Sequence, residues 1–189
     1  MKRSIITLIL VLVFASVSFA SDANGVRGSK WGSVPLTVMD NENMQGGELT
    51  MRGFNDEGLF ELQFEVPMKM GLATSYYVFD DNKRLINGGV GIFMKESDWN
   101  VYYQNYIAVK QFLKNYLKTD PSLDSCQEII IVGGNSVPCQ EVKNLIANHI
   151  VFKEVELENE FKSTKTNAVV KLFGSGNRCA TVSVHYTPT

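Results

Sequence analysis

Hydrophobic and polar residues alternate in several short stretches of the chain, which is the pattern of β-strands with one buried face. In the clearest stretch, Phe60 to Val66, apolar side chains at every second position are separated by Glu61, Gln63 and Glu65. Polar turn residues separate the stretches, as in antiparallel meanders. The pattern predicts strands at residues 49–53, 60–66, 73–79, 85–94, 128–132, 154–161, 168–173 and 179–186.

Other stretches have helical spacing. Residues 97–117 carry large apolar side chains at steps of three and four, and an Asp-Pro pair at 120–121 then ends the helix. Shorter helices are predicted after Ser33, with Ser33 as cap and Pro35 in the first turn, and at 138–149. The whole pattern predicts an α+β fold, with one or more antiparallel sheets, one long helix and one or two shorter helices.

The first twenty residues have the three parts of a secretory signal. A basic start is followed by an apolar run at 5–15 and by small residues at Ser18 and Ala20. The apolar run is too short for a membrane anchor, which needs about 20 residues. We expect residues 1–20 to be a cleaved signal peptide, and the protein to be periplasmic or secreted. The small, polar residues 21–30 then form a disordered leader, and residues 31–189 form a single α+β domain.

The chain of 189 residues has a formal net charge of −2, which becomes −4 when Lys2 and Arg3 leave with the signal. A mildly acidic chain without a basic cluster is not expected to bind nucleic acid or an anionic membrane surface. No segment after the signal is long and apolar enough to be a transmembrane helix. Because nucleic acid and anionic membranes are not expected partners, and because export is expected, we expect the partner to be another envelope protein.

Three cysteines lie after the predicted signal, and an oxidising compartment favours pairing two of them. The favoured disulfide joins Cys126 and Cys139, because the loop between them is short and closes at little entropic cost. A bond between Cys139 and Cys179 is the main competitor. No CxxC motif is present, so either bond is structural rather than redox-active.

Two further features are candidate interaction sites. Glu154, Glu156, Glu158 and Glu160 alternate along one predicted strand, so four carboxylates share one face. Such a row is a site for a cation or a basic partner, or simply a solvated face. Trp31 is the first large apolar side chain after the leader, and it either anchors the first helix on the sheet or contacts a partner.

The sequence indicates no catalytic, metal or cofactor site. Its two histidines, His149 and His185, have no further ligands at a workable spacing for a metal. The loop at 133–136 follows a strand, but it lacks the lysine of a phosphate-binding loop. No nucleophile with an ordered base can be assigned. These observations lean away from an enzyme, without deciding the question.

Several residues resemble a family of small exported bacterial proteins of unknown function. Trp31-Gly32, Val38 and Glu42 resemble the family's WGxSxxxVxxxE opening, and the stretch from Tyr77 to Leu85 looks like its YxFxxxxL hairpin. Tyr106 and Leu113 in the long helix are similar to the start of the family's YxxxxxxLxxKYG helix, and Val182–Tyr186 resembles its terminal strand ending in Tyr. The resemblance implies no catalytic residues.

The short helix followed by a hairpin also resembles the small domain of β-lactamase-inhibitor proteins and outer-membrane assembly lipoproteins, which bind other proteins. A shared fold alone does not transfer a function. The sequence therefore predicts an exported, non-catalytic protein that binds another macromolecule in the cell envelope through a sheet face or groove. The alternative is a carrier of a small apolar ligand or lipid, held between the sheet and the long helix.

Overall fold

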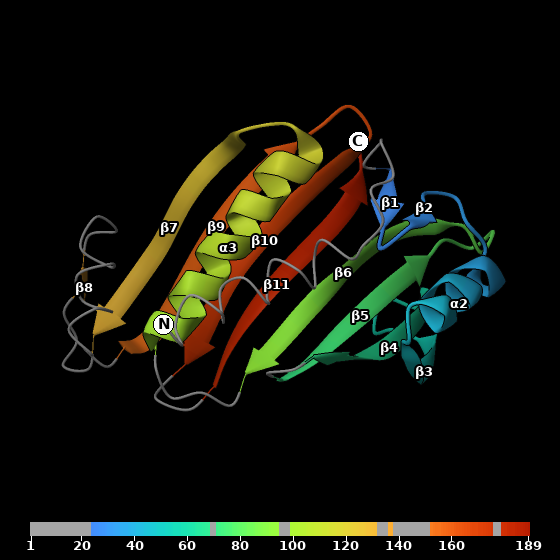
Figure 1. Cartoon of the computed structure of the whole chain (residues 1–189), viewed down its shortest axis with the longest axis horizontal. Coiled ribbons are helices and arrows are strands. Elements are labelled where there is room, and N and C mark those ends of the chain that lie inside the picture. Colours follow the sequence, from blue (N-terminus) through green and yellow to red (C-terminus); the bar gives the residue numbers. More distant parts are fainter. Residues whose placement is uncertain (1–23, 69–70, 95–98, 132–135, 138–151, 176–178) are drawn as a thin grey trace.

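One antiparallel β-sheet forms the main body of the described residues (Figure 1). The computed structural model describes residues 24–68, 71–94, 99–131, 136–137, 152–175 and 179–189. Within these ranges the large sheet has nine strands, in the order β3-β4-β5-β6-β11-β10-β9-β7-β8. Their bounds are β3 (Glu48–Phe54), β4 (Phe60–Met68), β5 (Gly71–Phe79), β6 (Leu85–Met94), β7 (Pro121–Ile131), β8 (Ser136–Val137), β9 (Phe152–Lys162), β10 (Thr166–Ser175) and β11 (Cys179–Pro188).

The predicted antiparallel sheet is confirmed, and the described residues also form helices α2 (Pro35–Met44) and α3 (Trp99–Leu117). Strands outweigh helices, so the fold is mainly β. Strand β7 is longer than predicted, because it begins directly at Pro121, where the preceding helical pattern stops. The helix predicted at 138–149 lies outside the described residues.

Helix α2 begins without the predicted serine cap. Its N-cap is Val34, which makes no side-chain hydrogen bond to the helix, and Pro35 occupies the first turn. Proline suits this position because its fixed φ is helical and its missing N–H would have no partner there. The backbone turns out of the helix at Gly46, whose φ of 78° is unfavourable for other residues.

The sheet consists of two halves with the same order of elements. The first half is α2 followed by β3 to β6, and the second half is α3 followed by β7 to β11. The final strands of the two halves, β6 and β11, pair antiparallel at the centre of the sheet, with Val90 opposite Val184. The order of strands outward from this pair is therefore mirrored, as an approximate two-fold axis through the sheet would produce.

Both helices lie over the same face of the sheet. Tyr106 of α3 donates a hydrogen bond to Asn159, and Glu42 of α2 accepts one from Ser75. The pairing register places Asn159 and Ser75 in one row across the strands, since opposite residues of neighbouring strands point to the same face. The row consists of Asn159, Val170, Val184, Val90, Ser75 and Phe64, and all six are buried.

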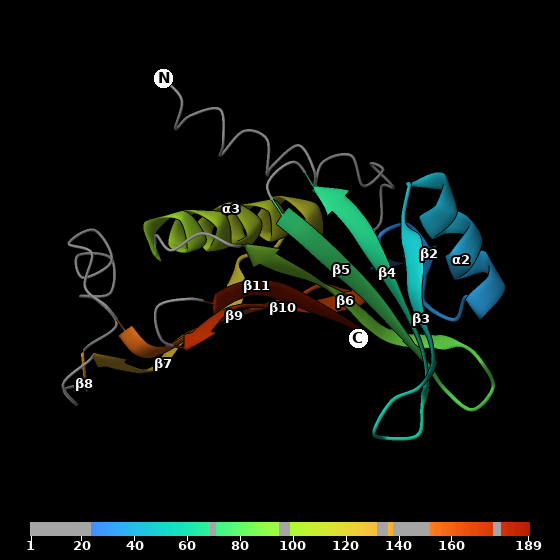
Figure 2. The ribbon, with the colours of Figure 1, turned by 90° about the horizontal axis from the view of Figure 1, so that it is seen from below.

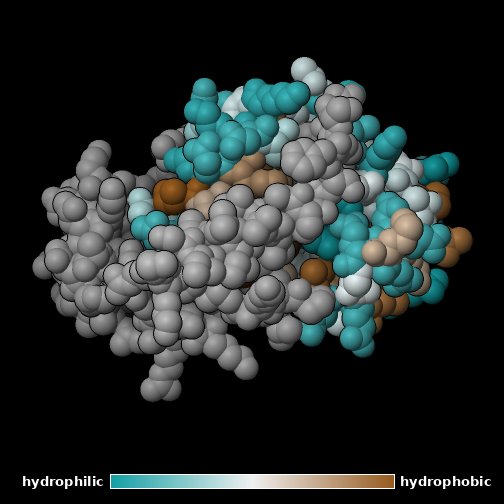
Figure 3. Space-filling view, in the orientation of Figure 1, coloured by the Kyte–Doolittle hydropathy of each residue, from teal (hydrophilic) through white to brown (hydrophobic). Residues whose placement is uncertain are grey.

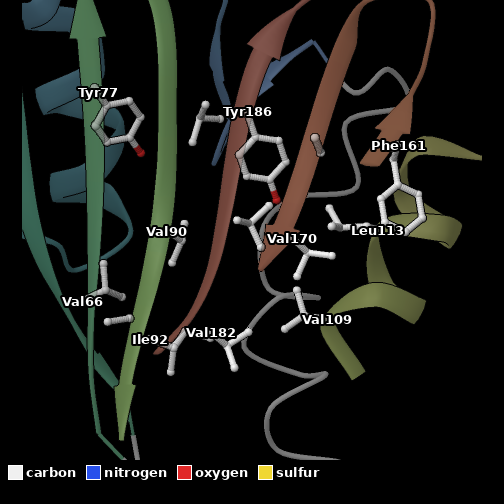
Figure 4. Close-up of a cluster of buried hydrophobic side chains, with 14 of the residues drawn as sticks. Val66, Tyr77, Val90, Ile92, Val109, Leu113, Phe161, Val170, Val182 and Tyr186 are labelled. Atoms are coloured by element: carbon white, nitrogen blue, oxygen red, sulfur yellow. The ribbon is translucent and has the colours of Figure 1, made fainter. Parts of the chain in front are cut away.

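The hydrophobic core fills the space between this face and the helices (Figure 4). Leu113 and Val109 of α3 are fully buried and project toward the strands of the second half. Tyr77 lies on β5 in the first half, away from α3. Buried strand residues of the core include Leu62, Phe64, Phe79, Val90, Ile92, Phe161, Val170, Leu172, Val182 and Val184.

Residues 25–30 form a hairpin, so the prediction of a disordered leader is wrong for this segment. Strands β1 (Gly25–Val26) and β2 (Ser29–Lys30) pair antiparallel across a two-residue turn. Both turn residues have positive φ, 45° at Arg27 and 83° at Gly28, as a type I′ turn requires. Val26 is 1% exposed because it packs over Gly88, where a Cβ would lie 3.1 Å from its methyl group.

The hairpin is fixed to α2 by a buried ion pair. Arg27 Nε lies 2.8 Å from Glu42 Oε1, and Glu42 is fully buried. The Glu42 carboxylate also accepts hydrogen bonds from Ser75 at 3.3 Å and from the Tyr77 hydroxyl. Burial lowers the pKa of Arg27, but the bond and the charge of Glu42 outweigh this, so the net pKa is raised and the guanidinium stays charged. Burial is also the main cause that raises the pKa of Tyr77.

Candidate functional site

The face opposite the helices is the candidate site. Within the described residues, both helices lie on the other side of the sheet, as Figure 2 shows in a view along its edge. An antiparallel sheet can leave one face to solvent. We call this side of the sheet the open face. Its central row consists of Glu160, Val169, His185, Gly89, Tyr76 and Gln63.

The centre of the open face is a flat pair of rings. The Tyr76 hydroxyl lies 2.5 Å from Nδ1 of His185, and the two rings are inclined by only 22°. Their centroids are 6.1 Å apart, so the rings lie end to end rather than face to face. Together they form a platform that spans β5, β6 and β11, and that joins the two halves of the sheet.

Gly89 of β6 lies beneath this platform. A Cβ at Gly89 would meet Cε1 of Tyr76 at 2.6 Å and the carbonyl oxygen of Val184 at 2.4 Å. No side chain larger than hydrogen fits there without moving the ring. The glycine therefore allows the Tyr76 ring to lie across the strand and reach His185 on the far side.

Both platform side chains are neutral near pH 7. Burial, together with the negative charge of Glu61, raises the pKa of Tyr76 to about 12. Burial, together with the positive charge of Lys171, lowers the pKa of His185 below its usual value of 6.5. The phenol therefore keeps its proton, and it shares a hydrogen bond with Nδ1 of the neutral imidazole, whose tautomer sets the direction of that bond. An uncharged aromatic platform suits binding through ring faces, not nucleophilic attack.

Carboxylates border the platform. Glu61 on β4 is only 9% exposed, and its Oε1 accepts a hydrogen bond of 2.7 Å from Gln63 Nε2. On the opposite side, Lys171 forms an ion pair with Glu158 at 2.6 Å. Phe173, beyond Lys171 on the same strand and face, is 46% exposed. The open face thus combines the half-buried rings of Tyr76 and His185 and the exposed ring of Phe173 with charged groups.

The predicted acidic row lies on β9, and part of it is neutralised. Glu158 pairs with Lys171, and Glu160 pairs with Lys162 at 3.2 Å. Both glutamates belong to the open face, since Asn159 between them points toward α3. Glu154 and Glu156 stand opposite Ser175 and Phe173 in the pairing register, and their side chains lie outside the described residues.

Trp31 is partly buried and packs against the hydrophobic core. Its indole Nε1 donates a hydrogen bond of 3.0 Å to Thr166 Oγ1 on β10. The residue therefore connects the segment before α2 with the second half of the sheet, on the helix-bearing side. This geometry agrees with the anchoring interpretation of Trp31 and separates it from the open face.

The proposed disulfide stays a prediction. Cys139 lies outside the described residues. Cys126 stands opposite Leu157 in the β7–β9 register, and Cys179 stands opposite Ser175 in the β10–β11 register.

A second exposed surface lies on α2 and β3. Leu36 is 66% exposed, Met44 is 79% exposed, and Phe54 is 68% exposed. Figure 3 shows hydrophobic side chains among polar ones at the end of the molecule that contains α2. Strand β3 is an edge of the sheet, but a register shift between Leu49 and Met51 disrupts it. Such bulges protect edges against pairing with another strand, so this surface is less suited to receive one.

Two classes of feature are missing from the described part of the chain. It contains no group of three or more His, Cys, Asp or Glu side chains placed to hold a metal ion. Neither described helix combines the length and the apolar character that crossing a membrane demands.

No sequence pattern indicated a functional role for Tyr76, Gly89, Glu61 or His185. Tyr76 and His185 are 109 residues apart, and no local pattern places them together. One signal was present: the Gly88-Gly89 doublet lies inside a predicted strand, and glycine there often marks a close approach of other groups. Both glycines are in fact approached closely, Gly88 by Val26 and Gly89 by Tyr76.

No known protein family, curated protein or solved structure matches this chain.

Proposed function

We propose that this protein is an exported, non-catalytic protein that binds another protein of the cell envelope through the open face of its sheet. The Tyr76–His185 platform at the centre of this face carries the proposal. Its two rings are held by a mutual hydrogen bond and by the glycine beneath them. Interface residues that are rigid before binding lose little entropy when the partner arrives.

The composition of the open face supports a protein partner. Tyrosine is enriched at the energetic centres of protein interfaces, where it supplies a large ring surface and a polar end. Phe173 adds an exposed aromatic side chain, and the ion pair of Lys171 with Glu158 lies between it and His185. An aromatic centre with charged groups around it is the common arrangement of protein interfaces.

The predicted signal at residues 1–20 supports export, and the resemblance to exported bacterial proteins supports the same location. The resemblance to small protein-binding domains agrees with a binding role. Our proposal therefore includes export to the cell envelope, a protein as the partner, and membership of the family that the sequence resembles.

The packing under α3 favours protein binding over the alternative of a small-ligand carrier. Val109, Leu113 and Tyr106 of α3 are buried against the sheet, and Phe161 and Leu172 fill the facing positions. These side chains occupy the space that a ligand between the sheet and α3 would need. This packing supports binding of a protein on the surface over binding of a small ligand beneath α3.

Site-directed photocrosslinking tests this proposal in the organism that produces the protein. A photoreactive residue at Thr181 reports on the open face, one at Leu36 reports on the α2–β3 surface, and one at Gln104 of α3 is the control. We expect one discrete adduct from Thr181, identified by mass spectrometry, and none from Gln104. The adduct should disappear in the Tyr76→Ala variant if that variant keeps its folded circular-dichroism spectrum.

Two outcomes would contradict the proposal. An adduct from Leu36 without one from Thr181 would place the interaction on α2 and β3. A Thr181 adduct that survives in folded Tyr76→Ala protein would show that the platform does not contribute to binding.

A further inference from the structure

Glu61 is a carboxylate with an unusual environment. It is 9% exposed, yet its only side-chain partner among the described residues is the neutral amide of Gln63. A carboxylate removed from water is stabilised mainly by a cation or by several hydrogen-bond donors. Glu61 has this one donor and forms no ion pair with another described residue. Among the described residues, no hydrogen-bond donor contacts its second oxygen, Oε2, so this oxygen can accept a bond from a cation that reaches it.

The Tyr76 ring lies beside this carboxylate. Gln63 is opposite Tyr76 in the β4–β5 register, and Glu61 is two residues away on the same face. Such diagonal neighbours are within reach of long side chains. The negative charge of Glu61 is the second cause, after burial, that raises the pKa of the phenol. Gly89 lies against one side of the ring, and the Tyr76 side chain is half-buried, so part of it is accessible.

A carboxylate next to a partly accessible aromatic ring is a suitable site for an organic cation. The negative face of a tyrosine ring attracts ammonium and guanidinium groups. A guanidinium group is planar, so it can stack on the ring and donate N–H groups to a carboxylate at its edge at the same time. An ammonium group makes point contacts and cannot stack in this way.

The charges around the ring favour a cation from outside the chain. The nearby ammonium group of Lys171 is held by Glu158 at 2.6 Å, on the far side of His185. The described side chains of the open face include the carboxylates of Glu48, Glu61, Glu65, Glu158 and Glu160 but only the ammonium groups of Lys162 and Lys171. This excess of negative charge attracts a basic partner.

We propose that the open face contains a subsite for an arginine side chain of the partner protein, with the guanidinium stacked on Tyr76 and bonded to Glu61. His185 and Gly89 are positioning residues, because they hold the ring flat without touching the cation. The subsite rests on the proposed function, and it gives the partner a chemical character: it presents an arginine on its contact surface.

A titration with small probes tests the subsite without knowledge of the partner. The probe is N-acetyl-arginine methylamide, added to the isotope-labelled exported chain while amide NMR signals are recorded. N-acetyl-citrulline methylamide has nearly the same shape without the charge, and N-acetyl-lysine methylamide has the charge without the plane. We expect saturable shifts at Glu61, Gly89 and His185 with the arginine probe, at least fivefold weaker binding of the lysine probe, and no saturation with the citrulline probe.

Variants assign the binding to the two groups. Glu61→Gln keeps the side-chain shape and should weaken arginine binding about tenfold. Tyr76→Leu removes the ring and should weaken binding by a similar factor. Glu48→Gln is the matched control, because it removes a carboxylate from the same face on β3, one strand farther from the Tyr76 ring. It should change binding less than twofold.

Equal binding of the citrulline probe, or unchanged arginine binding in Glu61→Gln, would overturn the subsite. If Tyr76→Leu does not fold, Glu61→Gln still decides, since it alters neither volume nor packing. The photocrosslinking experiment separates this failure from that of the proposed function. A Tyr76-dependent adduct from Thr181 without arginine binding would remove the subsite alone, whereas arginine binding without any adduct would contradict the protein-binding role.

Discussion

The two halves of the sheet place a helix on the same face in the same order, but they stabilise it with different chemistry. Under α2, the fully buried Glu42 carboxylate is bonded to Arg27, Ser75 and Tyr77. Under α3, the central polar contact is a neutral hydrogen bond of 2.7 Å from Tyr106 to Asn159, surrounded by apolar side chains.

This difference separates two roles of buried polar groups. A buried ion pair is weak evidence for net stability, because removing both charges from water is unfavourable. Once such a pair exists, however, the loss of one member leaves the other charge without a partner. The first half should therefore be more sensitive to a single substitution at its helix than the second half.

The largest effect is expected for Glu42→Ala. This change leaves Arg27 as an unpaired charge and removes the acceptor of Ser75 and Tyr77. We expect the free energy of unfolding to fall by about 3–5 kcal/mol, measured by urea denaturation. Asp40→Ala, at an exposed position of the same helix, is the control and should change stability by less than about 0.5 kcal/mol. A loss below about 1 kcal/mol for Glu42→Ala would show that the ion pair does not hold α2.

A smaller effect is expected for Tyr106→Phe in the second half. The change removes the hydroxyl that donates to Asn159, while the ring stays in the core. Leaving a neutral buried acceptor without this donor should destabilise the protein by about 1–2 kcal/mol. Gln111→Ala, on the exposed side of α3, is the control. If Tyr106→Phe lowers the free energy of unfolding as much as Glu42→Ala does, or more, then the two halves do not differ in their sensitivity to a substitution.

The smallest effect concerns pH and His185, which lies on the strand that joins the halves. Its pKa is lowered in the folded chain, by burial first and then by Lys171. The unfolded chain therefore binds more protons as the pH falls below about 6.5, the usual histidine pKa. The neutral His185 side chain therefore contributes its full share of stability above about pH 6.5. This share is lost progressively as the pH falls toward the lower pKa that His185 has in the folded chain.

We expect the stability difference between pH 7.5 and pH 5 to be smaller in His185→Gln than in the unmodified chain, by denaturation at both pH values. The comparison of the two proteins cancels the contributions of other titrating groups. An identical difference in both would mean that His185 does not titrate differently in the folded chain.

Much of the secondary structure could be predicted from the sequence, because its signals are local. Alternating apolar residues from Phe60 to Val66 specify a strand with one buried face, and the structure places β4 there. The hairpin at 25–30 was missed because its strands have two residues each and show no periodicity. The positive φ of Arg27 and Gly28 belongs to a turn that the Arg-Gly sequence allows but does not require.

The sequence by itself determined most strands and both described helices of the two halves, and for β4 it also determined which face is buried. Only the tertiary structure decided which strands are neighbours, because pairing β6 with β11 brings together segments about 90 residues apart, for which local periodicity carries no information. The pairing of β6 with β11 also places His185 beside the Tyr76 ring and so forms the platform. Tyr76 and His185 come from opposite halves of the chain, and they meet because Gly89 between them has no side chain to keep them apart.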